Sequence, residues 1–316
     1  MNRTERKPKV YLSEYIHPEA RKKLERYTEI IDDWSRLNEV EGLIRRNLKT
    51  ITAETMDSAP LLKVIGIHGT GRDGVDLKAA EERNIRVFST PGQNAGSVAE
   101  LNVALTLMLL RKVLPAVQYV YDADGENDCR SEFSGHEAGS RTVGIIGLGK
   151  IGKMTAQMLK DGFGTHVIGW SRSLTVEEAR SLGIGYCSDF REVLKKADVV
   201  ILGLALTPQT QGIIGGEELK LMKKDACLIN CARGALVDEE ALYEALRNRQ
   251  IAFAAFDVFT KEPVTGDNKL VSLHNFIALP HIGMNTEEAL YRVGMTVVDG
   301  ILKELGVETE ETDEQK

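Results

Sequence analysis

Cysteine is scarce in this chain of 316 residues, and its placement excludes two classes of protein. The four cysteines, Cys129, Cys187, Cys227 and Cys231, are too few and too scattered for a disulfide framework or a zinc site. Cys227 and Cys231 bracket an apolar run, where we expect them to act as small hydrophobic residues. The sequence therefore predicts a reducing, cytoplasmic setting and no bound metal.

Long hydrophobic runs are lacking too. The longest apolar stretch, 98–110, is interrupted by Glu100, Asn102 and Thr106 and is shorter than the roughly 20 residues that a membrane span requires. The first residues, MNRTERKPK, carry charges but no hydrophobic segment of the kind found in secretory signals. We therefore expect neither a membrane helix nor a secretory signal.

Positive charge is not in excess. The chain has 40 Lys and Arg residues against 47 Asp and Glu residues, and the net charge of -7 argues against nucleic acid as a partner. Part of this charge lies in 308–314, which we expect to be a solvated, frayed end. With 42% hydrophobic and 28% charged residues, the composition is that of a globular protein, and the length predicts two domains.

Short apolar runs alternate with helical patterns in the first ninety residues, which predicts a small parallel α/β unit. Strands are predicted at 10–12, 29–31, 42–44, 64–67 and 86–88, and helices at 18–27 and 77–82. The fourth strand runs into the glycine-rich turn 66–74, and open parallel sheets bind ligands at the carboxyl ends of their strands.

A second α/β pattern follows. We predict one long helix over about 98–120 and a loop over 121–140. Further strands are predicted at 143–146, 166–170, 199–203, 227–231, 252–256 and 276–278, with helices between them that include 239–247. A last amphipathic helix, 287–305, could return to pack on the first unit.

The most informative stretch is 141–172, which reads as strand, glycine turn, helix and strand. In a doubly wound sheet, Gly147 would allow the tight turn, Gly149 would leave room for a dinucleotide pyrophosphate, and Gly152 would let the helix pack closely on the strand. The helix start offers free N–H groups and a positive dipole end to the anion.

The residue expected to contact the ribose lies about twenty positions further on, at Ser171, and Arg172 follows it. An acidic residue there would repel a 2′-phosphate, whereas a small hydroxyl beside an arginine supplies a cation. This favours NADP(H), although NAD(H) stays possible. The alternative is that Arg172 simply points into solvent.

Three functional candidates follow apolar runs in the second half: Arg233, Glu262 and His281. All three are expected near the carboxyl ends of strands, where a doubly wound sheet places its site. Each alone has an ordinary explanation, because a single arginine or glutamate is usually a surface group and a single histidine is more often structural than catalytic. Their joint placement favours function.

At this point a family resemblance adds to the pattern. Residues 142–285 resemble the D-isomer-specific 2-hydroxyacid dehydrogenases, through TVGIIGLGKIG, the block LTPQTQGIIGGEELKLMKKDACLINCARGALVDEEAL, FDVFTKEP and LPHIGMNT. GTGRDGVDL and NAGSVAE agree in the first half. The resemblance implies two doubly wound parallel-sheet α/β domains, with a Rossmann-type cofactor domain (95–285) inserted in a flavodoxin-like substrate domain (1–94 and 286–316). It also implies a site in the cleft between them, and a homodimer formed through the long helix 98–120 and the loop after it.

The resemblance also implies residue roles. His281 would be the acid/base, Glu262 its acidic partner, and Arg233 the residue that holds the substrate. Main-chain N–H groups of the loop 70–72 would bind the other side of the substrate carboxylate. The implied substrate-binding residues are Thr70, Gly71, Arg72, Asn94 and Arg233. The implied cofactor-binding residues are Gly147, Gly149, Lys150, Ile151, Gly152, Ser171, Arg172, Ala205, Pro208, Cys231 and Asp257.

The sequence departs from the family pattern at several positions. Ser171 stands where most NAD-using relatives carry an acidic residue. The lack of an acidic residue at this position resembles the NADP(H)-preferring glyoxylate and hydroxypyruvate reductases. Arg72 stands where relatives usually carry an apolar or aromatic residue; it either faces the cleft, where it would suit a second anionic group, or is a surface charge. Ile67 and His68 replace an Arg-Ala pair seen in many phosphoglycerate dehydrogenases, and no regulatory domain is expected after residue 316.

The sequence therefore predicts an NAD(P)-dependent 2-hydroxyacid dehydrogenase that acts as a 2-keto acid reductase on glyoxylate-like or hydroxypyruvate-like substrates. One alternative is a 3-phosphoglycerate dehydrogenase without a regulatory domain. The other, from a different class, is a nucleotide-sensing binding protein like the corepressors that share this fold, because a fold alone does not fix function.

Overall fold

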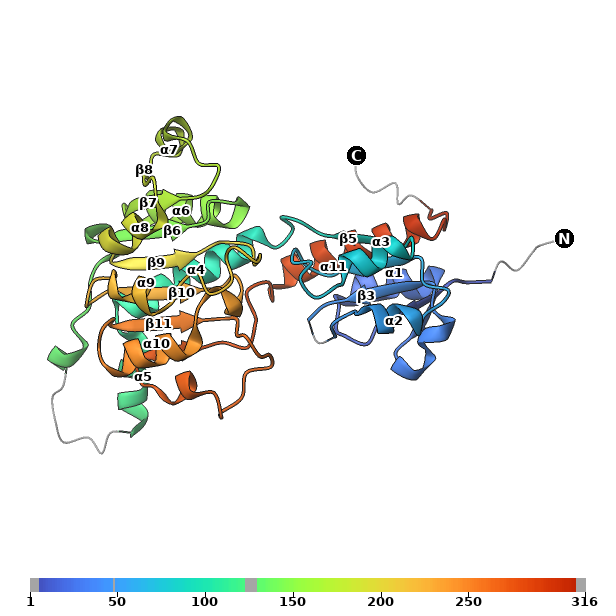
Figure 1. The fold of residues 1–316 in the computed structure, drawn as a ribbon, viewed down its shortest axis with the longest axis horizontal. Helices are drawn as coiled ribbons and strands as arrows, with labels where there is room; N and C mark the ends of the chain where they lie inside the picture. Colours follow the sequence, from blue (N-terminus) through green and yellow to red (C-terminus); the bar gives the residue numbers. More distant parts are fainter. Residues whose placement is uncertain (1–5, 48, 123–129, 311–316) are drawn as a thin grey trace. The chain divides into compact units, whose positions relative to one another are not determined.

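The computed structural model describes residues 6–47, 49–122 and 130–310. The chain divides into two compact units, which we call unit 1 (Met1–Asn94 with Asn285–Lys316) and unit 2 (Ala95–Met284). Each unit is built around its own parallel sheet (Figure 1). Cys129 and most of the acidic tail, from residue 311 onward, lie outside the described residues.

Unit 1 contains a five-stranded sheet in the order β2-β1-β3-β4-β5, with every neighbouring pair parallel. Its strands are β1 (Lys9–Tyr11), β2 (Glu29–Ile31), β3 (Gly42–Arg45), β4 (Val64–Ile67) and β5 (Arg86–Ser89). This is the flavodoxin-like order, so the predicted fold of this part is confirmed. Ligands of such sheets bind near the point between β1 and β3 where the strand order reverses.

Helices cover both faces of this sheet because successive strand residues point to opposite sides. Val10 packs in the cluster formed with α1 (Pro18–Tyr27) and α11 (Glu287–Glu304), whereas Tyr11 packs in the cluster on the other face. The other face is covered by η1 (Trp34–Glu39), α2 (Ala53–Asp57) and α3 (Leu77–Glu82). The last helix, α11, belongs to this unit and lies against α1, an arrangement that the sequence pattern left open (Figure 1).

Unit 2 contains a seven-stranded parallel sheet in the order β12-β11-β10-β9-β6-β7-β8. Its strands are β6 (Thr142–Ile146), β7 (His166–Trp170), β8 (Gly185–Tyr186), β9 (Val199–Leu202), β10 (Cys227–Asn230), β11 (Phe253–Phe256) and β12 (Phe276–Ala278). If β6 is counted as strand 1 of this unit, the order read from β8 is 3-2-1-4-5-6, that of the Rossmann fold, with β12 added at the edge. The predicted Rossmann-type fold is therefore confirmed. The strand order reverses between β6 and β9.

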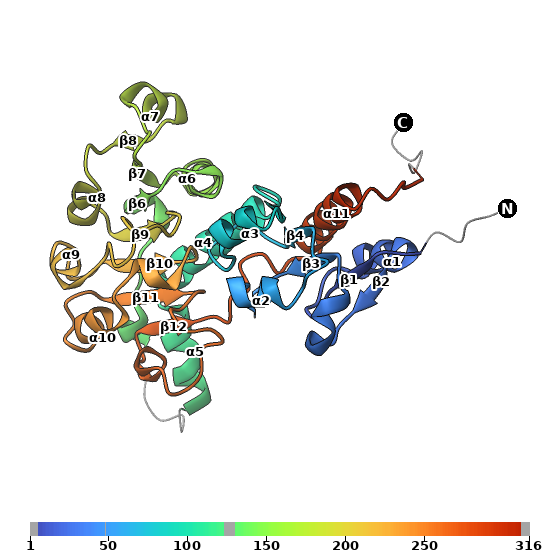
Figure 2. The same cartoon turned by 45° about the vertical axis from the view of Figure 1, so that its right-hand side comes forward.

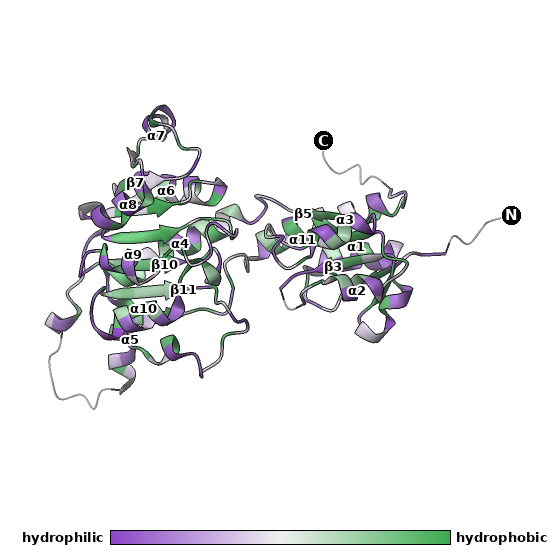
Figure 3. Cartoon of the chain, viewed as in Figure 1, coloured by the Kyte–Doolittle hydropathy of each residue, from purple (hydrophilic) through white to green (hydrophobic). Residues whose placement is uncertain are grey.

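The sheet of unit 2 is buried between two helix layers. Figure 2 shows α8 (Phe190–Lys196), α9 (Gly216–Lys220) and α10 (Glu239–Arg247) on one side, with α4 (Ala95–Leu110) and α6 (Lys150–Phe163) on the other. A further helix, α7 (Val176–Leu182), contributes Ala179 to the core on the α6 side. The strands of unit 2 are therefore mostly hydrophobic, and polar residues lie on the outer surfaces of its helices (Figure 3).

One predicted element is wrong. The single helix expected over 98–120 is two helices, α4 and α5 (Val113–Asp122), bent by 64°. Lys112 takes a positive φ of 52° at the break. Pro115 explains why the helix cannot continue, because its ring would clash with the carbonyl of Arg111 and it has no N–H to donate. Among the described residues no single helix is long and apolar enough to cross a membrane; α4 and α5 meet that criterion only as this bent pair.

Other differences concern short elements. Strand β8 has only two residues, too few for an apolar pattern to show. The segment expected to be a loop over 121–140 includes the end of α5 and two 3-10 turns, η2 (Arg130–Phe133) and η3 (Ala138–Ser140). Two further 3-10 turns follow later in the chain, η4 (Gly234–Leu236) and η5 (Lys269–Ser272).

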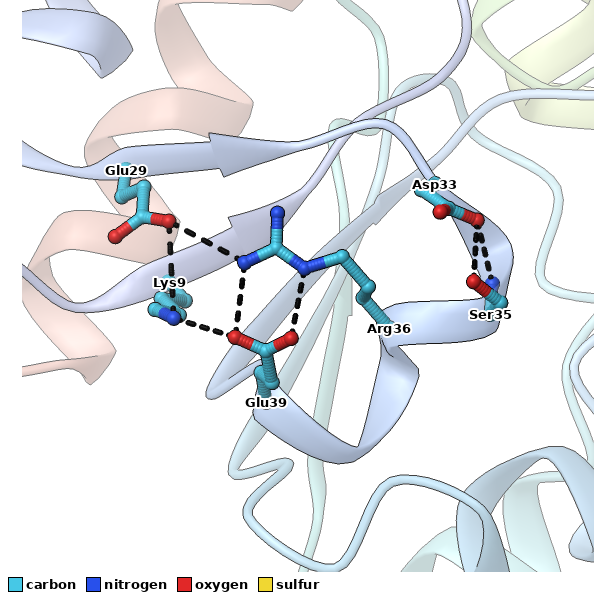
Figure 4. A network of polar contacts seen from close by, with 6 residues as sticks. All are labelled: Lys9, Glu29, Asp33, Ser35, Arg36 and Glu39. Atoms are coloured by element: carbon cyan, nitrogen blue, oxygen red, sulfur yellow. Dashed lines mark hydrogen bonds and ion pairs between the residues drawn. The ribbon is translucent and has the colours of Figure 1, made fainter.

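A network of charged side chains ties β1, β2 and η1 together on the surface of unit 1 (Figure 4). Arg36 donates Nε to Glu39 Oε1 at 2.7 Å and Nη2 to Oε2 at 2.9 Å, and Lys9 Nζ lies 2.5 Å from Oε2. Glu29 lies near both cations, at 3.6 Å from Arg36 and 3.7 Å from Lys9. The hydrogen bonds from Arg36 and then Lys9 lower the pKa of Glu39 to about 2.

We predict that Glu39→Gln lowers the thermal midpoint at pH 7, and less so in high salt, because the network is only partly buried and salt screens it. The depressed pKa of Glu39 contributes its full stabilisation above the ordinary value of 4.5 and loses it as the pH falls to the folded value of about 2, so the difference should shrink over that range and disappear below it. Scanning calorimetry against pH measures this. Glu308→Gln, an exposed carboxylate without a described partner, is the control; an equal loss in both variants contradicts the prediction.

Candidate functional site

The turn between β6 and α6 requires glycine at two positions. Gly147 has a φ of +107°, and a Cβ atom there would lie 2.4 Å from the carbonyl carbon of Gly203. A Cβ on Gly152, in the first turn of α6, would lie 2.3 Å from the oxygen of Gly147. A side chain at either position would therefore force the turn, the helix and the end of β9 apart.

Gly149 differs from these two glycines, because a Cβ atom there would meet nothing within 4 Å. It is the N-cap of α6 and provides no side-chain cap, so the first N–H groups of the helix are left for another acceptor. Open space in front of a helix N-terminus, at the point where the strand order reverses, fits the pyrophosphate of a dinucleotide. Lys150 and Ile151 begin the helix beside it.

The neighbouring strand ends carry the other predicted cofactor residues. Ser171 and Arg172 follow β7; Arg172 is exposed and makes no hydrogen bond or ion pair with a described residue. Ala205 and Pro208 lie in the loop after β9 and are exposed. The buried Thr210 shapes this loop, since its hydroxyl donates to the carbonyl of Ala205 at 2.7 Å.

The structure brings two of the predicted catalytic residues into contact. His281 Nδ1 lies 2.7 Å from Glu262 Oε2, and their side chains are 30% and 29% exposed. Glu262 Oε1 accepts the N–H of Phe259 at 3.0 Å, which fixes the other side of the carboxylate. Burial raises the pKa of Glu262, but the hydrogen bond and charge of His281, this N–H and the charge of Arg233 outweigh it and hold the pKa below its usual value.

Arg233 follows β10 on the same edge of the sheet. Its Nη1 donates to the carbonyl of Ala232 at 2.7 Å. The fully buried Asn230 holds the turn, because its amide donates to the carbonyl of Arg233 at 2.8 Å and its oxygen accepts the N–H of Ala232 at 3.0 Å. A Cβ on Gly234 would lie 2.0 Å from the carbonyl carbon of Phe259, so this turn packs directly on the segment that leads to Glu262.

Cys231 and Asp257 lie at the ends of β10 and β11. Burial, and then the charge of Asp257, raises the pKa of the Cys231 thiol, which therefore stays protonated. Asp257 is buried and accepts the N–H groups of Ile282 at 2.8 Å and Gly283 at 2.7 Å. Burial raises the pKa of Asp257 in spite of these two hydrogen bonds. No group of three His, Cys, Asp or Glu side chains suited to a metal ion occurs within the described ranges.

The predicted substrate loop belongs to unit 1, at the carboxyl end of β4. Thr70 donates its hydroxyl to Asn94 Oδ1 at 3.2 Å, and Gly71 follows it. The exposed Arg72 donates Nη2 to the carbonyl of Val87 at 2.9 Å, so its guanidinium is held on its own unit. Burial, and then the charge of Arg46, lowers the pKa of the preceding His68 to about 4, which keeps that imidazole neutral.

Sequence reasoning missed two residues that shape the site. Gly203 faces Gly147 so closely that a Cβ on it would lie 2.4 Å from the Gly147 oxygen. Asn230 is a buried amide within the apolar run LINCA. A polar residue inside a buried strand is a detectable signal, because a buried amide must find partners. The glycine contact depends on tertiary packing and leaves no local pattern.

We predict that two nearby glycine variants affect different properties, one stability and the other dinucleotide binding. Gly152→Ala should lower the thermal midpoint, because its methyl group would overlap the Gly147 carbonyl. Gly149→Ala should leave the midpoint unchanged, since its methyl group enters open space, yet weaken dinucleotide binding by roughly tenfold or more by filling the phosphate position. Calorimetry and fluorescence titration measure the two effects. Full dinucleotide affinity in Gly149→Ala contradicts the placement of the phosphates.

Comparison with known proteins agrees with this geometry. Residues 103–283 match the family model described as D-isomer specific 2-hydroxyacid dehydrogenase, NAD binding domain. The chain is 39% identical over 305 residues to a D-3-phosphoglycerate dehydrogenase of Methanocaldococcus jannaschii, covering 94% of this chain and 57% of that protein. It is 36% identical over 308 residues to a glyoxylate reductase of Thermococcus litoralis, covering 92% and 90% of the two chains.

A solved structure is similar along nearly the whole chain. It is the NADPH-dependent glyoxylate/hydroxypyruvate reductase from Sinorhizobium meliloti in complex with NADP and malonate, with a TM-score of 0.83 and 27% identity, covering 97% and 96% of the two chains. The chain spans only 57% and 49% of the length of two phosphoglycerate dehydrogenases that it matches. On these matches, the chain belongs to the D-isomer specific 2-hydroxyacid dehydrogenase family, and unit 2 contains its NAD(P)-binding domain.

Proposed function

We propose that the protein is an NAD(P)-dependent D-2-hydroxyacid dehydrogenase that works in the cell as a 2-keto acid reductase on a glyoxylate-like or hydroxypyruvate-like substrate. The observation that carries this proposal is the 2.7 Å contact between His281 Nδ1 and Glu262. It ties down one ring nitrogen and leaves Nε2 for the reaction. Glu262, His281 and Arg233 are the proposed catalytic residues.

Each of these side chains has a chemical task. The bound dinucleotide supplies the hydride that goes to the carbonyl carbon of the keto acid. The imidazolium of His281 donates a proton from Nε2 to the carbonyl oxygen, and Glu262 stabilises the imidazolium before this transfer. Arg233 offers a planar pair of donors to the substrate carboxylate and steadies the charge that develops on the oxygen. In the oxidative direction, neutral His281 accepts the same proton.

The two units have different roles in this proposal. Unit 2, extended to residue 285, binds the cofactor, while residues 1–94 and 286–316 form the substrate domain. Thr70, Gly71 and Arg72 hold the second side of the substrate carboxylate through main-chain N–H groups, and Asn94 supports that loop. The support is the family membership and the hydrogen bond from Thr70 to Asn94.

The proposed cofactor is NADP(H) in preference to NAD(H). Ser171 brings no negative charge to the end of β7, and the exposed Arg172 has no described partner, so its guanidinium is available to a 2′-phosphate. The Sinorhizobium meliloti reductase is described as NADPH-dependent. The remaining proposed cofactor contacts are the glycine turn with Lys150 and Ile151, Ala205, Pro208, Cys231 and Asp257.

We further propose a cytoplasmic homodimer. Helix α5 leaves a strip of apolar side chains exposed, of which Val120 and Tyr121 are 73% and 82% exposed and Val117 is 43% exposed. Apolar strips of this kind mark protein contacts. A second copy of the chain is the proposed occupant, and light scattering of the purified protein measures it.

One second candidate has a specific observation in its favour. The curated relatives that the chain matches at 39% and 37% identity are named D-3-phosphoglycerate dehydrogenase. This activity would need a second anion site beside the carboxylate site. Arg72 is the cation proposed from the sequence, and its guanidinium is held by the Val87 carbonyl. Assays with 3-phosphoglycerate and NAD separate this candidate from glyoxylate and hydroxypyruvate reduction.

We predict that purified protein oxidises NADPH with glyoxylate or hydroxypyruvate, and that His281→Ala lowers kcat by roughly 10²-fold or more because the general acid is lost. Dinucleotide affinity should change little. The matched control is His274→Ala, an exposed histidine on the same unit. Silence of the wild type across a panel of keto acids with both cofactors contradicts the proposed reaction.

A separate prediction concerns cofactor choice. Arg172→Ala should reduce kcat/KM for NADPH by roughly 10-fold or more and leave the value for NADH nearly unchanged, because only the 2′-phosphate loses a partner. Steady-state kinetics with both cofactors measure the ratio. The control is Lys224→Ala, an exposed cation before β10 and thus at the opposite edge of the parallel sheet. An unaltered NADPH to NADH ratio in Arg172→Ala refutes the assignment.

A further inference from the structure

The main chain of His281 has an unusual conformation. Its φ is +58°, in the left-handed region that side chains with a Cβ atom seldom adopt. Such a conformation costs free energy and persists only where the surroundings impose it. The hydrogen bond to Glu262 fixes the ring of His281 but makes no contact with its main chain. Some other group must hold the backbone.

The chain is pinned on both sides of His281. Before it, the N–H of Leu279 donates to the carbonyl of Phe256 at 2.8 Å, which extends the pairing of β11 and β12. After it, Asp257 accepts two consecutive main-chain N–H groups, from Ile282 with Oδ1 at 2.8 Å and from Gly283 with Oδ2 at 2.7 Å. Pro280 and His281 must close the turn between these two fixed points.

Asp257 is well placed to act as this second fixed point. It follows β11 directly, is 1% exposed, and its own N–H donates to the carbonyl of Asn230 at 3.0 Å, so the carboxylate is attached to the sheet. The fit is tight, because a Cβ on Gly283 would lie 3.0 Å from Asp257 Oδ2 and 3.5 Å from Val98 Cγ2. Both carboxylate oxygens are therefore engaged by the segment that carries His281.

We propose that Asp257 is a positioning residue that holds His281 in its left-handed conformation through the N–H groups of Ile282 and Gly283. Two carboxylates then divide the work: Glu262 orients the imidazole ring, and Asp257 fixes the backbone that carries it. This inference rests on the proposed function, because it concerns the aim of the acid/base. In this role Asp257 acts on the main chain next to His281. The role is distinct from the cofactor contact that the family resemblance implies.

A double-mutant cycle tests the inference, with keto acid reduction by NADPH as the assay. Asp257→Asn keeps the size of the side chain but puts an NH2 group against an N–H donor, so the loop should relax. We expect kcat to fall by roughly 10- to 100-fold, as misplacement of a catalytic group does, with a smaller change in the Kd for NADPH. In a His281→Ala background the same substitution should cost less than about twofold, since a group that acts through His281 has nothing left to position.

The outcomes separate the alternatives. An equal loss of kcat in both backgrounds, or a Kd for NADPH that rises as much as kcat falls, overturns the positioning role. An unchanged kcat in Asp257→Asn overturns it as well. Inactivity of the wild type is a failure of the proposed function, not of this inference. If Asp257→Asn does not fold, Gly283→Ala is the second test, because its methyl group pushes against the same carboxylate without removing its charge. A loss of kcat that disappears in the His281→Ala background supports the inference. An undiminished loss of kcat in that background overturns it.

Discussion

The proposed chemistry depends above all on the hydrogen bond between Glu262 and His281. A histidine without it could carry its proton on either ring nitrogen, and its ring could turn away from a substrate. The Glu262 carboxylate selects the form of His281 that carries a proton on Nδ1. Burial opposes ionisation of Glu262, but His281, the Phe259 N–H and Arg233 outweigh it and keep the carboxylate charged. The proposed reaction needs this arrangement in one place and one orientation.

The rest of unit 2 keeps that orientation through buried polar groups at the ends of two adjacent strands, β10 and β11. Asn230 is the last residue of β10, and its side chain braces the turn that presents Arg233. Asp257 follows β11 and accepts the main-chain N–H groups beyond His281. At the switch in strand order, between β6 and β9, the main chain comes so close to itself that only glycine fits, at Gly147, Gly152 and Gly203. Apolar packing stabilises the sheet. A few buried polar side chains, together with glycines at close main-chain contacts, position the residues at the carboxyl ends of its strands.

Much of this could be predicted from the sequence because the signals are local. Apolar runs such as 143–146 and 199–203 mark buried parallel strands, and Gly147, Gly149 and Gly152 mark a turn before a helix. The resemblance implied two doubly wound parallel sheets, one Rossmann-type and one flavodoxin-like, which the structure confirms, and it paired His281 with Glu262. The domain limits stay predictions, and so do the individual site roles, which depend on bound cofactor and substrate.

What could not be predicted depends on contacts between distant segments. Gly203 meets Gly147 only in the folded sheet, and the left-handed φ of His281 follows from Asp257, which lies 24 positions earlier in the chain. The break at Lys112 was missed because the apolar pattern continues across Pro115, and β8 is too short to show a pattern.

A crystal structure of the protein with NADP⁺ and an unreactive keto acid analogue such as oxamate tests the central claim most directly. The account predicts His281 Nε2 at about 3 Å from the carbonyl oxygen of the analogue, while Nδ1 of the same ring still donates to Glu262. The carboxylate of the analogue should lie beside Arg233. An imidazole turned away from that oxygen, or a dinucleotide bound elsewhere than over Gly149, would contradict it.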